Sequence, residues 1–205
     1  MSDKDNIQKI LDLSSDGIIT SGEVTSNGFH RGILRKMTEN GNLYNFGRGL
    51  YMKTDSWEDD FLMLQYKYSR GIYSYDTALY LHGFTDRTPI RYTMTFPKGY
   101  NTVSLKQEPI IIKRVIPENY SLGITEIRSP CGNTIHVYDL ERTLCDILRG
   151  KGSDIEIIND AMKRYVESKN KDIDKLLRYA EKLHVKPKIL NYILWETSWY
   201  TGLNC

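Results

Sequence analysis

The sequence predicts an α+β protein of two domains, one over residues 1–70 and one over residues 71–205. Three patterns indicate this fold class. Residues 1–53 alternate short helical patterns with a hairpin, strand-like runs and turn formers fill residues 90–138, and apolar residues at helical spacing continue to the C-terminus. The second domain is therefore expected to combine a mixed or antiparallel sheet with a helical C-terminal part. A chain of 205 residues is long enough for two such cores.

The first domain is predicted to begin with a helix over residues 5–14, where isoleucines and leucines recur at helical spacing. Thr20 and Glu23 then form the pattern of a capping box, in which each side chain satisfies a free amide at a helix start. This predicts a second helix that ends near Ser26. Asn27 and Gly28 break it, because both residues tolerate positive φ.

A third helix is predicted over residues 30–40, ending at Gly41. One arc of this helix is apolar and the opposite arc is polar, so one side packs inward and the other faces solvent. The inward arc holds Phe29, Ile33, Leu34 and Met37, the outward arc Arg31, Arg35 and Thr38, and the margins His30 and Lys36. Residues 43–46 and 50–52 are apolar runs around Gly47-Arg48-Gly49 and predict a hairpin with Arg48 at its tip.

Helices followed by a hairpin in this order predict a winged helix-turn-helix, whose second helix enters the major groove of DNA while the wing touches the backbone. Residues 20–53 carry five Lys or Arg against two acids, a local excess that suits phosphate contact. We therefore expect double-stranded DNA to be a partner. The alternative is the solvated face of an ordinary amphipathic helix. The residues expected to contact DNA are Ser26, Asn27, His30, Arg31, Arg35, Lys36, Thr38 and Arg48.

A helix over residues 57–69, capped by one of Thr54, Asp55 or Ser56, is predicted to join the two domains. Ser74 is expected to cap a short helix that ends at Gly83. The sheet is predicted from four runs at residues 90–96, 110–116, 123–128 and 134–138. Four helices are expected after it: the first two are capped at Asp139 and Asp154, the third is opened by Asp172 or Ile173, and the last is opened by Pro187.

A second basic surface is expected on the predicted sheet, because residues 87–114 hold six basic side chains and one acid. Arg87, Arg91, Lys113 and Arg114 are its candidate residues, with a nucleic-acid backbone as the ligand. The alternative is a solvated sheet face.

Catalytic, metal and cofactor sites are not expected from the motifs present. The sequence contains no phosphate-binding loop, dinucleotide fingerprint or nucleophile elbow. His136, Asp139, Glu141, Arg142 and Asp146 gather ionisable groups, but Asp139 is explained as a helix cap and we favour a structural role. Three cysteines, Cys131, Cys145 and Cys205, have no zinc or disulfide spacing and are expected to be reduced thiols.

The chain is expected to be cytoplasmic, without a membrane partner. It has no run of 18 apolar residues, and its first residues, MSDKDNIQKIL, carry acids where a signal peptide needs an apolar core. The net charge of +2 is close to neutral, so the prediction of DNA binding depends on local charge alone.

Three stretches resemble the AbiEi antitoxins of the AbiE abortive-infection systems, which are type IV toxin-antitoxin modules. They are GRGLYMK at residues 47–53, SYDTALYLHGFTDRTP at residues 74–89 and VYDLERTLCDILRG at residues 137–150. The patterns S-x-x-[ST]-A-L-x-L-H-G and D-L-E-R-T-L-x-D are the specific part. Gly32 and Ile33 depart from the family, which often has small or polar helix formers there.

The resemblance implies an N-terminal winged helix that binds inverted repeats in its own promoter and represses the operon. It also implies a C-terminal domain that neutralises a nucleotidyltransferase-like toxin without forming a stable complex. Arg31, Arg35, Lys36 and Arg48 would inherit the contacts to DNA. Two alternatives stay open: the C-terminal domain is an enzyme that reverses or prevents the toxin's modification, or the protein is a repressor unrelated to a toxin.

Overall fold

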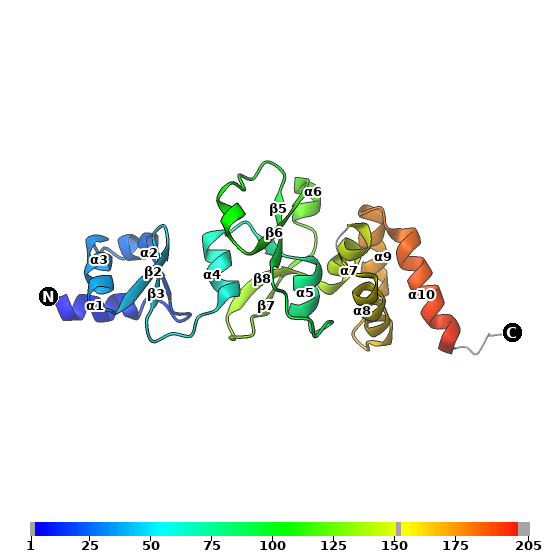
Figure 1. Cartoon of the computed structure of the whole chain (residues 1–205), viewed down its shortest axis with the longest axis horizontal. Coiled ribbons are helices and arrows are strands. Elements are labelled where there is room, and N and C mark those ends of the chain that lie inside the picture. The colour runs from blue at the N-terminus through cyan, green and yellow to red at the C-terminus, as the bar shows by residue number, and fades with distance from the viewer. Residues whose placement is uncertain (1–2, 151–152, 201–205) are drawn as a thin grey trace. The chain divides into compact units, whose positions relative to one another are not determined.

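The computed structural model describes residues 3–150 and 153–200 and shows a mixed α+β protein (Figure 1). Its described residues form ten α-helices, one 3-10 helix and two sheets. The chain divides into two compact units, which we describe separately. The N-terminal unit comprises Met1–Ser69 and Arg128–Ile135, and the C-terminal unit comprises Arg70–Ile127 and His136–Cys205.

The N-terminal unit packs three helices against a small antiparallel sheet with the strand order β1-β3-β2. Its buried core is formed by Ile10, Ile19, Val24, Leu34, Met37 and Leu43. The elements are α1 (Asp3–Leu11), β1 (Ile18–Thr20), α2 (Ser21–Ser26), α3 (Gly32–Glu39), β2 (Leu43–Gly47) and β3 (Leu50–Lys53). Helix α4 (Asp60–Lys67) follows in the same unit.

The predicted caps of this unit are confirmed at two helix ends. The Thr20 hydroxyl accepts from the Glu23 amide at 3.1 Å, and the Glu23 carboxylate accepts from the Thr20 amide at 2.8 Å. Gly41 has φ +74°, and the amide of Asn42 donates back to the Met37 carbonyl, which closes the end of α3. The predicted hairpin is confirmed as well.

The predicted start of α3 is two residues too early. The helix begins at Gly32, and Arg31 occupies the N-cap without a capping side-chain bond. His30 lies before the helix, where its Nδ1 accepts from the Gly32 amide at 3.2 Å. An imidazole acceptor thus supplies the bond that a shorter polar side chain makes at many helix starts.

The helix predicted over residues 57–69 is also shorter than expected. Helix α4 spans Asp60–Lys67, and its N-cap is Asp59, whose carboxylate accepts from the amides of Phe61 and Leu62. The expected caps at residues 54–56 lie outside the helix. Trp57, expected as the first residue of this helix, precedes it and is 90% exposed.

The C-terminal unit contains a five-stranded mixed sheet with the order β6-β5-β4-β8-β7. Strand β4 pairs antiparallel with β5 and parallel with β8, and β5 pairs parallel with β6. The sequence did not predict β1 or β4 as strands. The elements are β4 (Ile72–Tyr73), α5 (Tyr75–Leu81), β5 (Tyr92–Pro97), η1 (Ser104–Gln107), β6 (Ile110–Val115), α6 (Pro117–Tyr120), β7 (Ile124–Arg128) and β8 (Thr134–Tyr138).

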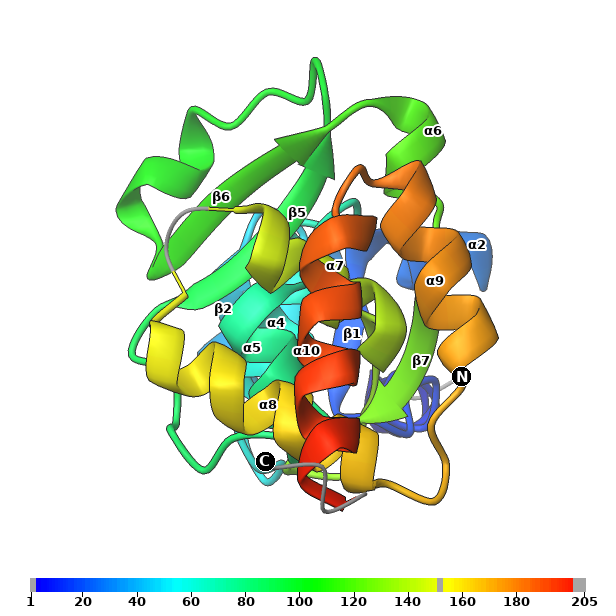
Figure 2. The same cartoon turned by 90° about the vertical axis from the view of Figure 1, so that its right-hand side faces the viewer.

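Four helices complete the unit and pack together (Figure 2). They are α7 (Leu140–Arg149), α8 (Ile155–Glu167), α9 (Ile173–Lys182) and α10 (Lys186–Tyr200). The expected N-cap positions at Asp139, Asp154 and Asp172 are confirmed, although the Asp154 side chain makes no capping bond. Ser74 also stands at an N-cap without capping; its hydroxyl instead contacts Thr95.

No helix in the described ranges has the length and apolar character needed to cross a bilayer. Cys131 is an exposed free thiol and Cys145 a buried one. Burial raises the pKa of Cys145 to about 12, so this thiol stays protonated and unreactive. Cys205 lies outside the described residues.

Candidate nucleic-acid interface

The packing of α3 determines which of its residues face outward. Leu34 and Met37 are buried at 1% and 0% exposure. With about 100° of rotation per residue, the face opposite them is a ridge formed by Gly32, Arg35 and Glu39. All three ridge residues are exposed. Arg31 and Lys36 then lie on opposite margins of this ridge, about 140° apart around the helix axis.

The centre of the ridge carries an ion pair. Arg35 Nε lies 2.9 Å from Glu39 Oε1, and the two side chains are 86% and 59% exposed. The pair places one positive and one negative charge at the outermost point of the helix. The net charge at the centre of the ridge is therefore lower than the sequence suggested. Any attraction of a polyanion to α3 then depends more on Arg31 and Lys36 at its margins.

On one margin, Arg31 lies beside the hairpin tip. Arg31 and Arg48 line a shallow depression of about 360 Å³, to which Ser21 and Tyr51 also contribute. Neither arginine forms an ion pair with any residue that the structure describes. A guanidinium group presents its N–H donors in a planar fork that matches the oxygens of carboxylates and phosphates.

The hairpin tip is fixed next to this margin by its backbone. The Ser21 amide donates to the Gly49 carbonyl at 2.8 Å, which joins the tip to the start of α2. Gly49 has φ +71°, and a Cβ on it would lie 2.5 Å from Ser21 Oγ. Only glycine fits both constraints, so Arg48 is held in place by the residue that follows it.

The other predicted contact residues lie elsewhere on the unit. Asn27, His30 and Lys36 line a second depression of about 780 Å³ on the opposite flank of α3. Ser26 donates its hydroxyl to the Glu23 carbonyl and Thr38 to the Leu34 carbonyl, so both serve their own helices. Of the eight residues, Arg31 and Arg48 line one depression, Asn27, His30 and Lys36 line the other, and Arg35 lies on the ridge between them.

The second basic surface is not a continuous free surface. Arg87 pairs with Asp154 and Glu156, Arg91 donates to the Ile110 carbonyl, and Arg114 bonds the Thr102 hydroxyl. The Lys113 ammonium lies 4.5 Å from the centre of the Tyr75 ring. Lys113 and Arg114 are neighbours on β6 and point to opposite faces of the sheet. The four candidate residues thus all have partners within the fold, and their role as a nucleic-acid surface stays a prediction.

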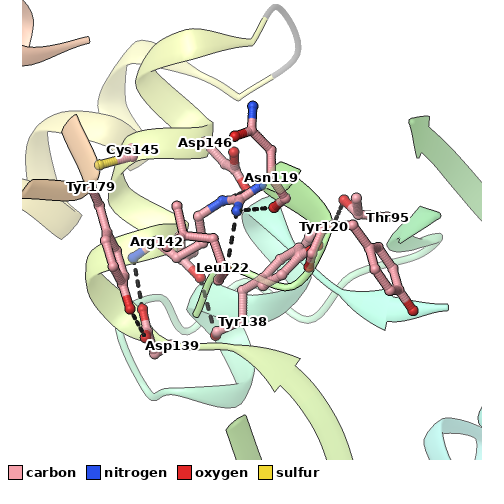
Figure 3. Close-up of polar contacts among 12 residues, drawn as sticks. Thr95, Asn119, Tyr120, Leu122, Tyr138, Asp139, Arg142, Cys145, Asp146 and Tyr179 are labelled. Carbon is pink, nitrogen blue, oxygen red and sulfur yellow. Dashed lines mark hydrogen bonds and ion pairs between the residues drawn. The ribbon is translucent and has the colours of Figure 1, made fainter. Parts of the chain in front are cut away.

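The ionisable cluster of the C-terminal unit surrounds Arg142, whose side chain is fully buried (Figure 3). Arg142 Nε bonds Asp146 Oδ2 at 2.9 Å, and Nη1 donates to the carbonyls of Asn119 and Leu122. The guanidinium also lies 4.4 Å from the centre of the Tyr138 ring. These contacts attach α7 to α6 and β8, so the role of Arg142 is structural.

The remaining acids of the cluster have partners within the fold. Asp139 accepts from the Arg142 amide and from the Tyr179 hydroxyl. Lys175 lies 3.1 Å from Asp139 and 2.9 Å from Glu141. Although burial opposes the effect, these two carboxylates raise the pKa of Lys175. His136 is exposed and pairs with Glu126, so it stands apart from the buried Asp146.

The other motif used for the family resemblance also consists of packing residues. Thr77 Oγ1 accepts from the Thr93 amide at 2.8 Å, and the Ser74 hydroxyl bonds that of Thr95 at 2.9 Å. His82 Nε2 lies 2.8 Å from the Tyr138 carbonyl. These bonds hold α5 against the sheet. Within the described ranges, no group of three or more His, Cys, Asp or Glu side chains is placed to hold a metal ion.

No protein-family model and no curated protein matches the chain. Among solved structures, the fold is similar to the crystal structure of RV2827C protein from Mycobacterium tuberculosis. The superposition has a TM-score of 0.54 and 12% sequence identity, and it covers 94% of this chain and 80% of that chain. At this identity the similarity concerns the fold alone.

Proposed function

We propose that this protein is a DNA-binding autorepressor and the antitoxin of a type IV toxin-antitoxin system. The N-terminal unit acts as a winged helix-turn-helix: α2 and α3 form the helix pair, and β2 with β3 forms the wing. The observation that supports this proposal most strongly is the exposed face of α3 next to the hairpin tip, where Arg31 and Arg48 line one depression. The partner is promoter DNA with inverted repeats, in the cytoplasm.

The DNA-binding half is tested by fluorescence anisotropy with the duplex upstream of the protein's own gene. We expect the Arg31→Ala, Arg48→Ala double variant to bind more weakly and to lower the slope of log K against log salt by about 0.9 per lost phosphate contact. Lys169→Ala removes one exposed charge from the C-terminal unit and serves as the control. Wild-type affinity and slope in the double variant would refute the assignment.

The antitoxin half derives from the resemblance to AbiEi antitoxins and assigns neutralisation to the C-terminal unit. Its partner is a nucleotidyltransferase-like toxin, neutralised without a stable complex. The test is co-expression with the product of the neighbouring gene. The Arg31→Ala, Arg48→Ala variant should lose repression and still rescue growth, because its C-terminal unit is intact. Failure of the wild-type chain to rescue growth would leave a repressor unrelated to a toxin.

Catalysis by the C-terminal unit is not part of the proposal. An enzyme would need His136, Asp139 and Asp146 to converge on a substrate. Instead, His136 is exposed beside Glu126, Asp139 caps α7, and Asp146 is buried against Arg142. Full rescue of toxin-inhibited cells by His136→Ala at normal protein levels is the expected result.

A further inference from the structure

A second depression lies on the N-terminal unit, between α1 and the start of α3. Its volume is about 780 Å³, and its lining includes Lys9 and Asn6 from α1. Asn27, His30 and Lys36 line it from the other side, and none of its lining residues is acidic. Lys9 and Asn6 were not among the sequence-predicted contacts, because α1 meets α3 only in the folded unit. We call this site the α1–α3 depression.

The chemistry of the α1–α3 depression suits an anion. Two ammonium groups and the Asn6 amide supply donors, while Asn27 Nδ2 already donates to the Glu23 carbonyl at 2.9 Å. His30 adds a further donor, since its Nδ1 accepts from the Gly32 amide and the proton of the neutral ring therefore resides on Nε2. Lysines, asparagines and histidines of this kind are common partners of nucleic-acid phosphates.

The position of the α1–α3 depression beside α3 indicates which anion it would bind, a phosphate of the DNA backbone. Lys36 and Arg31 lie on opposite margins of the helix, so the depression and the Arg31–Arg48 site flank the same ridge. An α-helix with its side chains is about 10–12 Å wide, and the major groove is about 12 Å wide. A helix that fills the groove therefore presents each flank to one of the two sugar-phosphate strands.

We propose that the α1–α3 depression binds one sugar-phosphate strand of the DNA while Arg31 and Arg48 bind the opposite strand. Lys9 and Lys36 are its cations, and Asn6 contributes a neutral hydrogen bond. The ridge of Gly32 and Arg35 then faces the bases between the two strands. This inference rests on the proposed function and adds α1 to the DNA-binding surface.

The test compares Lys9→Ala with wild type in the full chain, using the upstream duplex and an unrelated duplex over a range of salt concentrations. A phosphate contact predicts that affinity falls by the same factor on both duplexes, because phosphates carry no sequence information. It also predicts that the slope of log K against log salt falls by about 0.9. Lys9→Glu should weaken binding further.

Two matched variants complete the experiment. Lys4→Ala removes the same charge from α1 at a position that does not line the depression, and its affinity and slope should equal those of wild type. Asn6→Ala should lower affinity on both duplexes and leave the slope unchanged, because a neutral side chain releases no counterion. Equal thermal midpoints of all variants would show that α1 remains folded.

The outcomes separate this inference from the proposed function. If Arg31→Ala, Arg48→Ala weakens binding while Lys9→Ala matches wild type in affinity and slope, the repressor assignment stands and the α1–α3 contact is refuted. A loss for Lys9→Ala confined to the upstream duplex also refutes it, because a base contact would then be responsible. If the wild-type chain fails to bind any upstream duplex, both proposals fall.

Discussion

Arg31 in the N-terminal unit and Arg142 in the C-terminal unit are the same residue type in opposite surroundings. Arg31 is exposed and lines a depression with Arg48, whereas Arg142 is fully buried and bonds Asp146 and two backbone carbonyls. An exposed cation contributes little to stability and remains available for a ligand. A buried cation must have all its interactions inside the fold. The structure therefore assigns Arg142 to folding, while Arg31 is available for the DNA contact that we propose.

The same comparison limits what the family motifs can indicate. Both motifs that resemble AbiEi antitoxins consist mainly of residues that pack, cap or bond within the C-terminal unit, such as Thr77, His82 and Arg142. They specify how α5 and α7 attach to the sheet. A motif of this kind argues for a shared fold, while evidence for neutralising a toxin has to come from exposed residues.

The largest expected effect comes from breaking the buried pair. Arg142→Ala leaves the Asp146 carboxylate without its partner in an apolar site and frees the carbonyls of Asn119 and Leu122. Loss of one member of a buried ion pair costs about 3–5 kcal/mol. We expect a decrease of this size in the free energy of unfolding, measured by urea denaturation with circular dichroism.

Arg149→Ala is the matched control, because it removes the same charge from an exposed position on the same helix. Its effect should stay within about 0.5 kcal/mol. The double variant Arg142→Met, Asp146→Leu should recover part of the lost stability, since two apolar side chains of similar size need no hydrogen bonds. Equal losses for Arg142→Ala and Arg149→Ala would contradict the structural role of Arg142.

A buried charge in the N-terminal unit, Asp59, tests whether the contrast between Arg31 and Arg142 arises from burial or from the unit in which each residue lies. This carboxylate of the N-terminal unit is 1% exposed, caps α4 and accepts from the Ser129 hydroxyl and the Asn133 amide. Removing an N-cap costs about 0.5–2 kcal/mol. Unsatisfied buried partners add about 1–3 kcal/mol. We expect Asp59→Ala to lose about 1.5–5 kcal/mol in urea denaturation.

Asp55→Ala is the control for this measurement, because the sequence offered Asp55 as an alternative cap and the structure leaves it exposed outside the helix. Its unfolding free energy should match that of wild type. If Asp55→Ala were the more destabilised variant, the helix start predicted from sequence would be right and the observed cap wrong.

Asp59 also illustrates where sequence reasoning ends. Local signals sufficed for the capping box at Thr20, the glycine that ends α3 and the start of α7, because each depends on residues within a few positions. Asp59 was missed because Ser129 and Asn133, which fix it, lie 70 and 74 residues away. Strand β4 was missed because two residues carry no period.

The candidate interface was likewise predictable only in the parts that depend on residues close together in the sequence. The pattern identified α3, the hairpin and their cations, and the structure places Arg31 and Arg48 around one depression. The i,i+4 spacing of Arg35 and Glu39 is a local signal that predicts their ion pair, but the count of charges over residues 20–53 did not use this spacing. The pattern could not show that Lys9 approaches α3, because contacts between helices depend on tertiary packing.

A moderate effect on DNA binding is expected from Glu39→Gln. The change removes a negative charge from the α3 ridge and releases Arg35, so affinity for any duplex should rise and the salt slope should steepen by about 0.9. Because solvent screens an exposed ion pair, its loss should change the stability of the fold little. Glu118→Gln, an exposed change in α6, is the control and should leave anisotropy titrations unchanged.

The smallest effect concerns a partly buried acid of the C-terminal unit. Burial raises the pKa of Asp76, although the Ser153 hydroxyl, which donates to it at 2.6 Å, and Lys113 act in the opposite direction. With the folded-state pKa above the unfolded one, the stability that Asp76 contributes is fully present below the unfolded pKa and is lost as pH rises through the folded pKa. Asp76→Asn keeps an acceptor oxygen for Ser153 and removes this loss.

We therefore expect Asp76→Asn to have a slightly higher urea midpoint than wild type at neutral pH, with the difference disappearing in acid, once Asp76 is protonated in both the folded and the unfolded state. Asp55→Asn, at an exposed position, should follow wild type at every pH. A lower midpoint for Asp76→Asn at neutral pH would mean that attraction by Lys113 outweighs burial. Asp76 would then belong with the stabilising ion pairs of its unit, and the contrast between buried and exposed charge would not extend to half-buried acids.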